Sequence, residues 1–332
     1  MAAPVRARSP VLLSLVLVLP VVVALAGLCL LLPQAWAGQA EMVFSYRPRP
    51  VPEGQERDFE EALMRLALDH TVAAEGPYRM EAAPDRVTTP RIVQDLRRRA
   101  YPGQIVVQTA TAALMQDLLY IPFPTDSGIT GLRLALSTGV VADMTTEVRT
   151  VADLSRFSSV QGLGWPDVGI LRDHGLPVEE ISSRESMALM VARGRADLYW
   201  RGINEVSRDI AKAAETNATG LTVAPGVALF YPLPKFFFAH PADAAHLRRL
   251  ERGLTAAWAD GSFHALWRRY FAAAVSAVAF EGRTVFVLSN PDAGPVQDSL
   301  RRFELPEVSA LRGRGRWITV QPLTAQGERT QP

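Results

Sequence analysis

The sequence is almost free of cysteine and of lysine. Its 332 residues include one cysteine, Cys29, and two lysines, Lys212 and Lys235, although lysine and arginine together number 35. Those basic residues balance 34 acidic ones, so the formal net charge is +1. A chain without a basic excess is no general binder of nucleic acid, because such proteins displace counterions with positive charge. Hydrophobic residues make up 48% of the chain, which excludes a chain disordered throughout and suffices for a core.

Familiar catalytic and metal-binding motifs are also missing. The five histidines show neither His-x-x-x-His nor His-Glu-x-x-His spacing, which argues against a zinc site. The sequence contains no Gly-x-Ser-x-Gly turn, phosphate-binding glycine loop or Gly-x-Gly-x-x-Gly motif. Acid pairs such as Glu60-Glu61 and Glu179-Glu180 are more typical of solvated faces than of a glycosidase. We therefore expect no metal, no cofactor and no catalytic residue, in a protein that is not an enzyme.

The N-terminal region has the pattern of a signal peptide. Two arginines precede an apolar run at 11–32, and Ala35-Trp36-Ala37 supplies the small residues that a signal peptidase recognises. We expect cleavage of 1–37 and export to the periplasm, which leaves a chain without cysteine, disulfide or thiolate metal site. A retained membrane anchor is the alternative, because the apolar run is long enough to span a bilayer. A lipid anchor on Cys29 is a third reading.

Beyond this segment, helix-like and strand-like patterns alternate along the chain. Apolar residues recur at helical spacing over 58–70 and 184–193, whereas 105–107 has the composition of a buried strand and 131–136 is also predicted to be a strand. Such alternation predicts an α/β fold with helices packed on mainly parallel sheets. The polar tail 323–332 is predicted to be disordered.

Three segments carry a resemblance to a known fold family. Val151-Ala152-Asp153-Leu154 resembles a helix that opens a second lobe, and 185–197, with a Gly-x-x-Asp turn, resembles the following helix of that lobe. The stretch 231–238, followed by Trp258-Ala259-Asp260-Gly261-Ser262, resembles the return of the chain into a first lobe. On these segments the sequence resembles extracytoplasmic solute-binding proteins of family 3, which have the two-lobed, type II periplasmic-binding-protein fold.

The resemblance implies an organisation and a function. Lobe one would comprise 38–132 plus 229–322 and lobe two 133–228, with two crossing strands as a double-crossover hinge. A small-molecule ligand would bind between the lobes. The implied function is capture of a small, anionic or zwitterionic, amino-acid-like metabolite for transport or sensing. The implied partner is the membrane permease of an ABC transporter or the sensor domain of a receptor, and we expect a monomer.

One departure from the family affects the expected ligand. Amino-acid-binding members carry an arginine before the first crossing, and its guanidinium holds the ligand carboxylate by two parallel hydrogen bonds. The corresponding stretch 103–132 contains neither lysine nor arginine, and the first basic residue after it is Arg133. Either Arg133 or Arg201 has replaced the missing arginine, or the ligand is not an amino acid.

Arg133, Arg201 and Glu205 are candidate ligand-binding residues. Arg133 lies within an apolar strand, where a charge is costly unless a ligand or an acid such as Asp126 meets it. Arg201 follows the apolar stretch 198–200 at a strand end, where sheet proteins often bind ligands. Glu205 lies four residues further on, within reach of Arg201 for an intrahelical pair if a helix has begun near Gly202. For each residue a purely structural ion pair is the alternative.

Trp165, Tyr231 and Lys235 complete the set of candidates. Trp165, in the loop 162–167, is suited to stacking on a ligand, and a buried wedge is the alternative. Tyr231 and Lys235 flank the expected second crossing, where ordinary residues at the edge of a sheet would look the same.

Two other functions remain open at this point. An enzyme on the same fold, such as a dehydratase, would use Glu205 or another cleft acid for proton transfer. A binding fold that has lost its ligand would serve as a protein-interaction module, and its activity would not depend on Arg133 and Arg201.

Overall fold

The computed structural model describes residues 41–48, 57–83, 88–312 and 314–323. The predicted signal peptide at 1–37 lies outside these residues, and so does the predicted tail apart from Leu323. None of the helices in the described part of the chain combines the length and the apolar content needed to span a bilayer.

Helices alternate with strands along the chain, as an α/β fold requires. Asp58 caps the first described helix by accepting hydrogen bonds from two backbone amides, and Gly261, with a φ of 81°, separates α11 from α12. The helices are α2 (Phe59–Asp69), α3 (Val72–Glu75), α4 (Thr89–Arg97), α5 (Ala112–Asp117), α6 (Gly139–Met144), α7 (Val151–Leu154), α8 (Pro166–Asp173), α9 (Arg184–Ala192), α10 (Val206–Glu215), α11 (Ala244–Ala259), α12 (Ser262–Ser276), α13 (Gln297–Arg302) and α14 (Pro306–Ser309).

The described strands form three sheets. β1 and β2 form a parallel pair, β3-β10-β4 is a small antiparallel sheet, and a seven-stranded sheet has the order β12-β11-β9-β5-β8-β6-β7. Because β5 runs antiparallel to both of its neighbours, the large sheet is mixed rather than parallel throughout. The strands are β1 (Met42–Tyr46), β2 (Tyr78–Ala82), β3 (Ile105–Thr109), β4 (Leu119–Ile121), β5 (Leu132–Thr138), β6 (Ser159–Gly162), β7 (Val178–Ile181), β8 (Leu198–Gly202), β9 (Leu221–Phe230), β10 (Lys235–Ala239), β11 (Thr284–Val287) and β12 (Arg316–Thr319).

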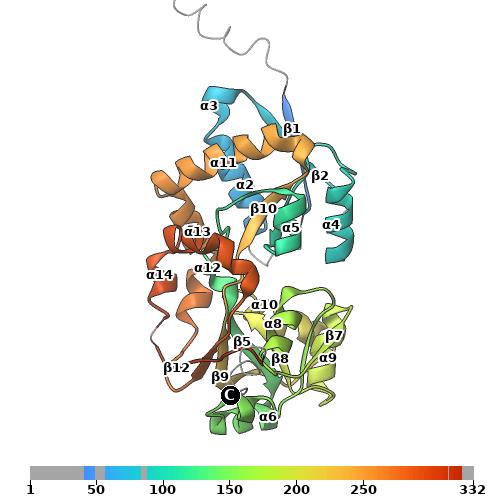
Figure 1. The fold of residues 1–332 in the computed structure, drawn as a ribbon, viewed down its shortest axis with the longest axis vertical. Helices are drawn as coiled ribbons and strands as arrows, with labels where there is room; N and C mark the ends of the chain where they lie inside the picture. The colour runs from blue at the N-terminus through green and yellow to red at the C-terminus, as the bar shows by residue number, and fades with distance from the viewer. Residues whose placement is uncertain (1–40, 49–56, 84–87, 313, 324–332) are drawn as a thin grey trace, which may run out of the picture.

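The elements are arranged in two lobes, which Figure 1 shows one above the other. The two small sheets lie in the upper lobe with α2, α4, α5 and α11, and the large sheet lies in the lower lobe with α6, α8, α9 and α10. The predicted two-lobed α/β fold is thus confirmed, and we call the upper lobe one and the lower lobe two.

Two backbone crossings connect the lobes and touch each other. The chain enters β5 after Gly131 and leaves β9 before Tyr231, and the amide of Tyr231 donates a hydrogen bond to the carbonyl of Gly131 at 3.2 Å. A Cβ atom on Gly131 would overlap the Tyr231 carbonyl, so this close approach requires glycine.

The C-terminal segment contacts both lobes. β11 and β12 extend the large sheet beyond β9, whereas the Phe303 ring packs on Phe123 of lobe one at 4.5 Å between centroids. Ser127 Oγ also donates to the Phe303 carbonyl at 2.7 Å. The predicted boundaries, 38–132 plus 229–322 for lobe one and 133–228 for lobe two, stay a prediction.

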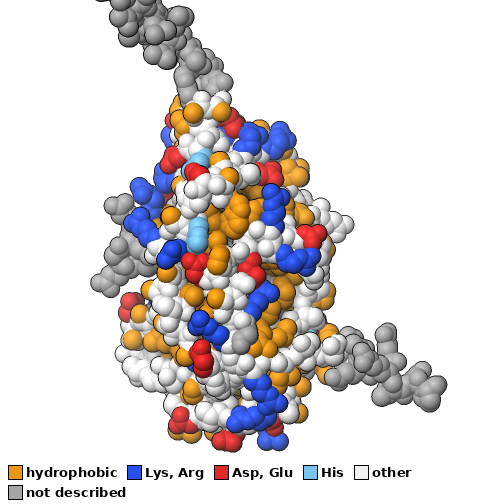
Figure 2. Space-filling model, turned by 90° about the vertical axis from the view of Figure 1, so that its left-hand side faces the viewer, with side chains coloured by type: hydrophobic (Ala, Val, Ile, Leu, Met, Phe, Trp, Pro, Cys, Tyr) orange, Lys and Arg blue, Asp and Glu red, His pale blue; other side chains and the backbone are white. Residues whose placement is uncertain are grey.

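Two helices of lobe one are closely packed. α2 lies so near α11 that a Cβ atom on Gly253 would overlap the backbone of Ala67. On the face shown in Figure 2, basic and acidic side chains are interspersed, in keeping with the net charge of +1.

Candidate functional site

A cavity of about 1130 Å³ lies between side chains of the two lobes. Lobe one contributes residues of α2, α4, β3 and the start of β10, and lobe two contributes residues of β5, β8, α8, α9 and α10. Clefts between domains are the usual place for small-molecule sites. Five of the six predicted residues line this cavity: Arg133, Trp165, Arg201, Glu205 and Lys235.

Tyr231, the sixth predicted residue, is fully buried behind Arg133 and is not among the cavity-lining residues. Its hydroxyl donates to Asp167 Oδ1 at 2.7 Å and accepts from Arg133 Nε at 3.2 Å. Burial, aided by the charge of Asp167 and opposed by that of Arg133, raises the pKa of Tyr231 well above its usual value. The hydroxyl therefore stays protonated and positions the other two groups.

Arg133 is held by two acids. Its Nη2 pairs with Asp167 at the start of α8, and its Nη1 lies 3.4 Å from Glu205 Oε2. Arg133 and Asp167 are each only 3% exposed, so this is a buried ion pair. The partner named from the sequence, Asp126, is wrong, because the Asp126 carboxylate accepts a hydrogen bond from Thr130 Oγ1 instead.

Arg201 lies on the strand next to Arg133, and Glu205 joins the two arginines. Arg133 is opposite Gly202 and Arg201 is opposite Leu134, so the two side chains start on different faces of the sheet, although both guanidiniums reach the carboxylate of Glu205. Arg201 pairs with Asp209 of α10, and its Nη2 lies 3.2 Å from Glu205 Oε1. The helix expected near Gly202 begins only at Val206, so the Arg201–Glu205 pair connects a strand to the residue before a helix.

Cations surround the carboxylate of Glu205. It lies between Arg133 and Arg201 and accepts a hydrogen bond from the amide of Gly202 at 3.1 Å. Burial would raise the pKa of Glu205, but the charges of Arg201, Lys235 and Arg133 outweigh burial and hold that pKa well below its usual range. Glu205 is therefore ionised at neutral pH.

The guanidiniums of two arginines lie over the Trp165 ring. The indole packs on Gly162, where a Cβ atom would overlap the ring. The guanidinium carbons of Arg201 and Arg184 lie 5.1 and 5.7 Å from the ring centroid, within the range of cation–π attraction. Arg184, which is not among the candidates predicted from the sequence, is the first residue of α9 and lines the cavity.

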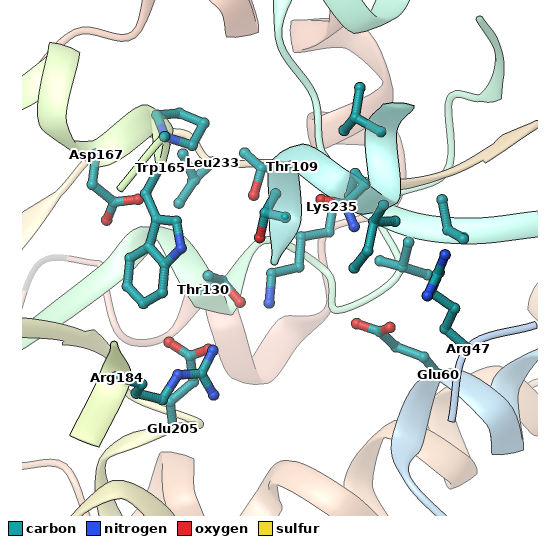
Figure 3. A pocket seen from close by; sticks show the side chains of 18 of the residues that line it. Arg47, Glu60, Thr109, Thr130, Trp165, Asp167, Arg184, Glu205, Leu233 and Lys235 are labelled. Atoms are coloured by element: carbon teal, nitrogen blue, oxygen red, sulfur yellow. The ribbon is translucent and has the colours of Figure 1, made fainter. Parts of the chain in front are cut away.

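Lys235 is the central cation that lobe one contributes. It is the first residue of β10 and pairs in register with Thr109 of β3, and its carbonyl accepts a hydrogen bond from the Thr125 amide at 2.9 Å. With the backbone fixed in this way, its side chain points into the cavity toward Thr130 and Glu205 (Figure 3). Its ammonium forms no ion pair with any residue that the structure describes.

Sequence reasoning also missed Asp167 and Asp209. Each is buried and neutralises an arginine that the sequence did predict. Asp209 could have been considered, because it lies only eight residues after Arg201, in the first turn of the helix that follows β8. Among the described residues, no group of three or more His, Cys, Asp or Glu side chains is arranged to hold a metal ion.

Solved structures of known proteins share this fold. An ancestral arginine-binding protein bound to arginine is 15% identical, with a TM-score of 0.51 over 70% of this chain and 98% of its own. An arginine transport-system periplasmic binding protein from Legionella pneumophila is 13% identical, with a TM-score of 0.50 over 70% and 99%. A histidine kinase sensor domain similar to periplasmic binding proteins is 12% identical, with a TM-score of 0.50 over 70% and 96%.

These likenesses establish the fold of the chain as that of the type II periplasmic binding proteins, which confirms the fold that the sequence resemblance implied. No protein-family model matches the sequence, and no curated protein does either.

Proposed function

We propose that this protein is a periplasmic solute-binding protein that captures a small anionic metabolite between its two lobes. The fold and the cavity between the lobes support binding of a small solute. The two adjacent crossings at Gly131 and Tyr231 would act as the hinge on which the lobes close.

Lys235 is the observation that carries the anionic character of the ligand. Its ammonium points into the cavity and lacks an ion-pair partner among the described residues, whereas Arg133 and Arg201 are each paired with buried aspartates. A cation that is partly withdrawn from water is stabilised by an anion brought to it. An acidic group of the ligand supplies that anion.

Glu205 does not offer a site for a cationic ligand. Although two of the structural neighbours are arginine-binding proteins by name, the carboxylate of Glu205 already lies among Arg133, Arg201, Lys235 and Arg184. A ligand ammonium or guanidinium would meet these cations on its approach. The low pKa of Glu205 also makes it a poor proton donor at neutral pH, which counts against the dehydratase-like alternative.

The partner would be a membrane permease or the sensor domain of a receptor. Structural neighbours of both kinds exist, one from a transport system and one that is itself a sensor domain. The chain would act as a monomer outside the cytoplasmic membrane after its N-terminal segment is cleaved.

A thermal-shift screen of the purified protein tests this function. Amino acids, organic acids, sugars and peptides are each added at millimolar concentration, and a ligand at 100 times its Kd should add about 2.7 kcal/mol to the unfolding free energy. We expect organic acids to raise the Tm. Lys235→Met should weaken their binding by at least about tenfold, the effect of one charge-assisted hydrogen bond.

The matched control is Arg156→Met, which removes an exposed cation outside the cavity. It should leave the affinity unchanged. Stabilisation by sugars or by cationic amino acids alone would contradict the anionic ligand, and no stabilisation by any solute would contradict the binding function itself.

A further inference from the structure

Two polar atoms in the lobe-two wall of the cavity are buried without a hydrogen-bond partner. They are the hydroxyl of Tyr199 and Nη2 of Arg201, which belong to residues 0% and 2% exposed. Both residues are on β8, and both line the cavity. Although Arg201 Nη2 lies 3.2 Å from a Glu205 oxygen, the two are not aligned for a hydrogen bond.

Buried polar atoms are almost always satisfied, so an unpaired donor in the wall of a cavity is suited to an acceptor that a ligand brings there. Tyr199 Oη can donate or accept a hydrogen bond, whereas Arg201 Nη2 can only donate. Burial raises the pKa of Tyr199 to about 12, so its hydroxyl keeps its proton at neutral pH. Two donors that lack acceptors are suited to an oxygen-bearing anion.

Arg184 adds a cation to the same place. It lies over the Trp165 ring together with Arg201 and forms no ion pair with any described residue. Desolvation within the cleft, followed by repulsion from Arg201, lowers the pKa of Arg184 although its side chain is partly exposed. The acids that face this pair, Glu205 and Asp209, are already engaged by Arg201.

The charges that line the cavity leave one cation in excess on each side. The lobe-two wall holds five basic and four acidic side chains, and Lys235 faces that wall from lobe one. If the lobes closed around a monoanion, its single negative charge would balance either Lys235 or the excess positive charge of the lobe-two wall, but not both. The indole of Trp165 lies beside the lobe-two group and offers an apolar surface to the middle of a ligand.

We propose that the ligand is a dicarboxylate, with one carboxylate on Lys235 and the second in a subsite made by Tyr199, Arg201 and Arg184. This inference rests on the proposed capture of an anionic solute and adds the second subsite to it. The Trp165 ring would contact the carbon chain that joins the two carboxylates.

Isothermal titration of the purified protein with two matched series tests the inference. One series is the α,ω-dicarboxylates from succinate to suberate, and the other is the monocarboxylates of equal carbon number. At the best chain length, the dicarboxylate should bind at least about tenfold more tightly than its monocarboxylate, the factor that one charge-assisted hydrogen bond supplies.

Variants locate the second carboxylate. Arg184→Met and Tyr199→Phe should each bring the affinity ratio of dicarboxylate to monocarboxylate toward one. The matched control is Arg193→Met, which removes an exposed arginine just beyond the other end of α9 and outside the cavity and should preserve the ratio.

The outcomes separate the inference from the proposed function. Equal affinity for both series, or a ratio that survives both cavity substitutions, overturns the dicarboxylate and its subsite, while anion binding that depends on Lys235 would still stand. Binding of other solutes with no dicarboxylate binding overturns the inference as well. Failure to bind any solute overturns both.

Discussion

Replacing Asp167 with asparagine should destabilise the protein more than any change at its surface. Asp167 neutralises Arg133 and accepts a hydrogen bond from the Tyr231 hydroxyl, and all three side chains are buried. Asparagine keeps the shape of aspartate but leaves Arg133 with only Glu205, 3.4 Å away, as a counter-charge. Removing one partner of a buried ion pair costs about 3 to 5 kcal/mol.

We expect a loss near the lower end of that range, about 3 kcal/mol, because Glu205 remains. This corresponds to roughly a 100-fold change in the unfolding equilibrium constant. Tyr231→Phe removes only the hydroxyl and should cost about 1 kcal/mol. The two substitutions share partners, so their effects in the double variant should not add.

Urea-induced unfolding followed by tryptophan fluorescence measures these losses. The control is Asp173→Asn, an exposed acid at the other end of α8, which should change stability by less than about 0.5 kcal/mol. If Asp167→Asn cost no more than this control, the buried pair would not contribute to folding, and our account of Arg133 would be wrong.

Two further predictions concern lobe one. The hydrogen bond to Asp260 raises the pKa of His70, so the stability that His70 contributes is fully present below its pKa in the unfolded chain and is lost as pH rises through its pKa in the folded protein. His70→Gln should therefore cost more stability at about pH 5.5 than at about pH 8.5, as measured by urea unfolding. The reverse order would refute the pairing with Asp260. Gly253→Ala should cost about 2 kcal/mol of stability, because a Cβ atom there would overlap the Ala67 backbone. The control is Gly169→Ala, where a Cβ atom meets open space, and it should raise stability slightly. Equal Tm shifts for the two variants would contradict the close packing of α2 on α11.

Much of the fold could be predicted because local signals and the global fold agree. Gly261 predicts the break between α11 and α12, since its left-handed φ of 81° favours glycine. Asp197 is likewise at the turn where the sequence places it, and its carboxylate accepts hydrogen bonds from the amide and hydroxyl of Ser158. Such signals lie within a few residues of the structure that they determine.

The partners of the charged residues could not be predicted in the same way. Asp126 is only seven positions before Arg133, but the turn that follows it directs its carboxylate to Thr130. Asp167 comes from the start of α8, 34 positions away, and only the return of the chain from β6 brings it beside β5. Distance along the sequence therefore says little about which acid neutralises a buried arginine.

The rarity of lysine was the one compositional signal that pointed at the cavity. All but two of the basic residues are arginine, and both lysines, Lys212 and Lys235, line the same cavity. Arginine has a rigid guanidinium that suits fixed pairs such as those of Arg133 and Arg201, whereas lysine is a compact charge on a flexible chain. If the proposed ligand supplies the counter-charge of Lys235, that residue has no fixed partner in the protein to match. Lysine meets that requirement, and its position at the start of β10 places the charge where lobe one faces lobe two.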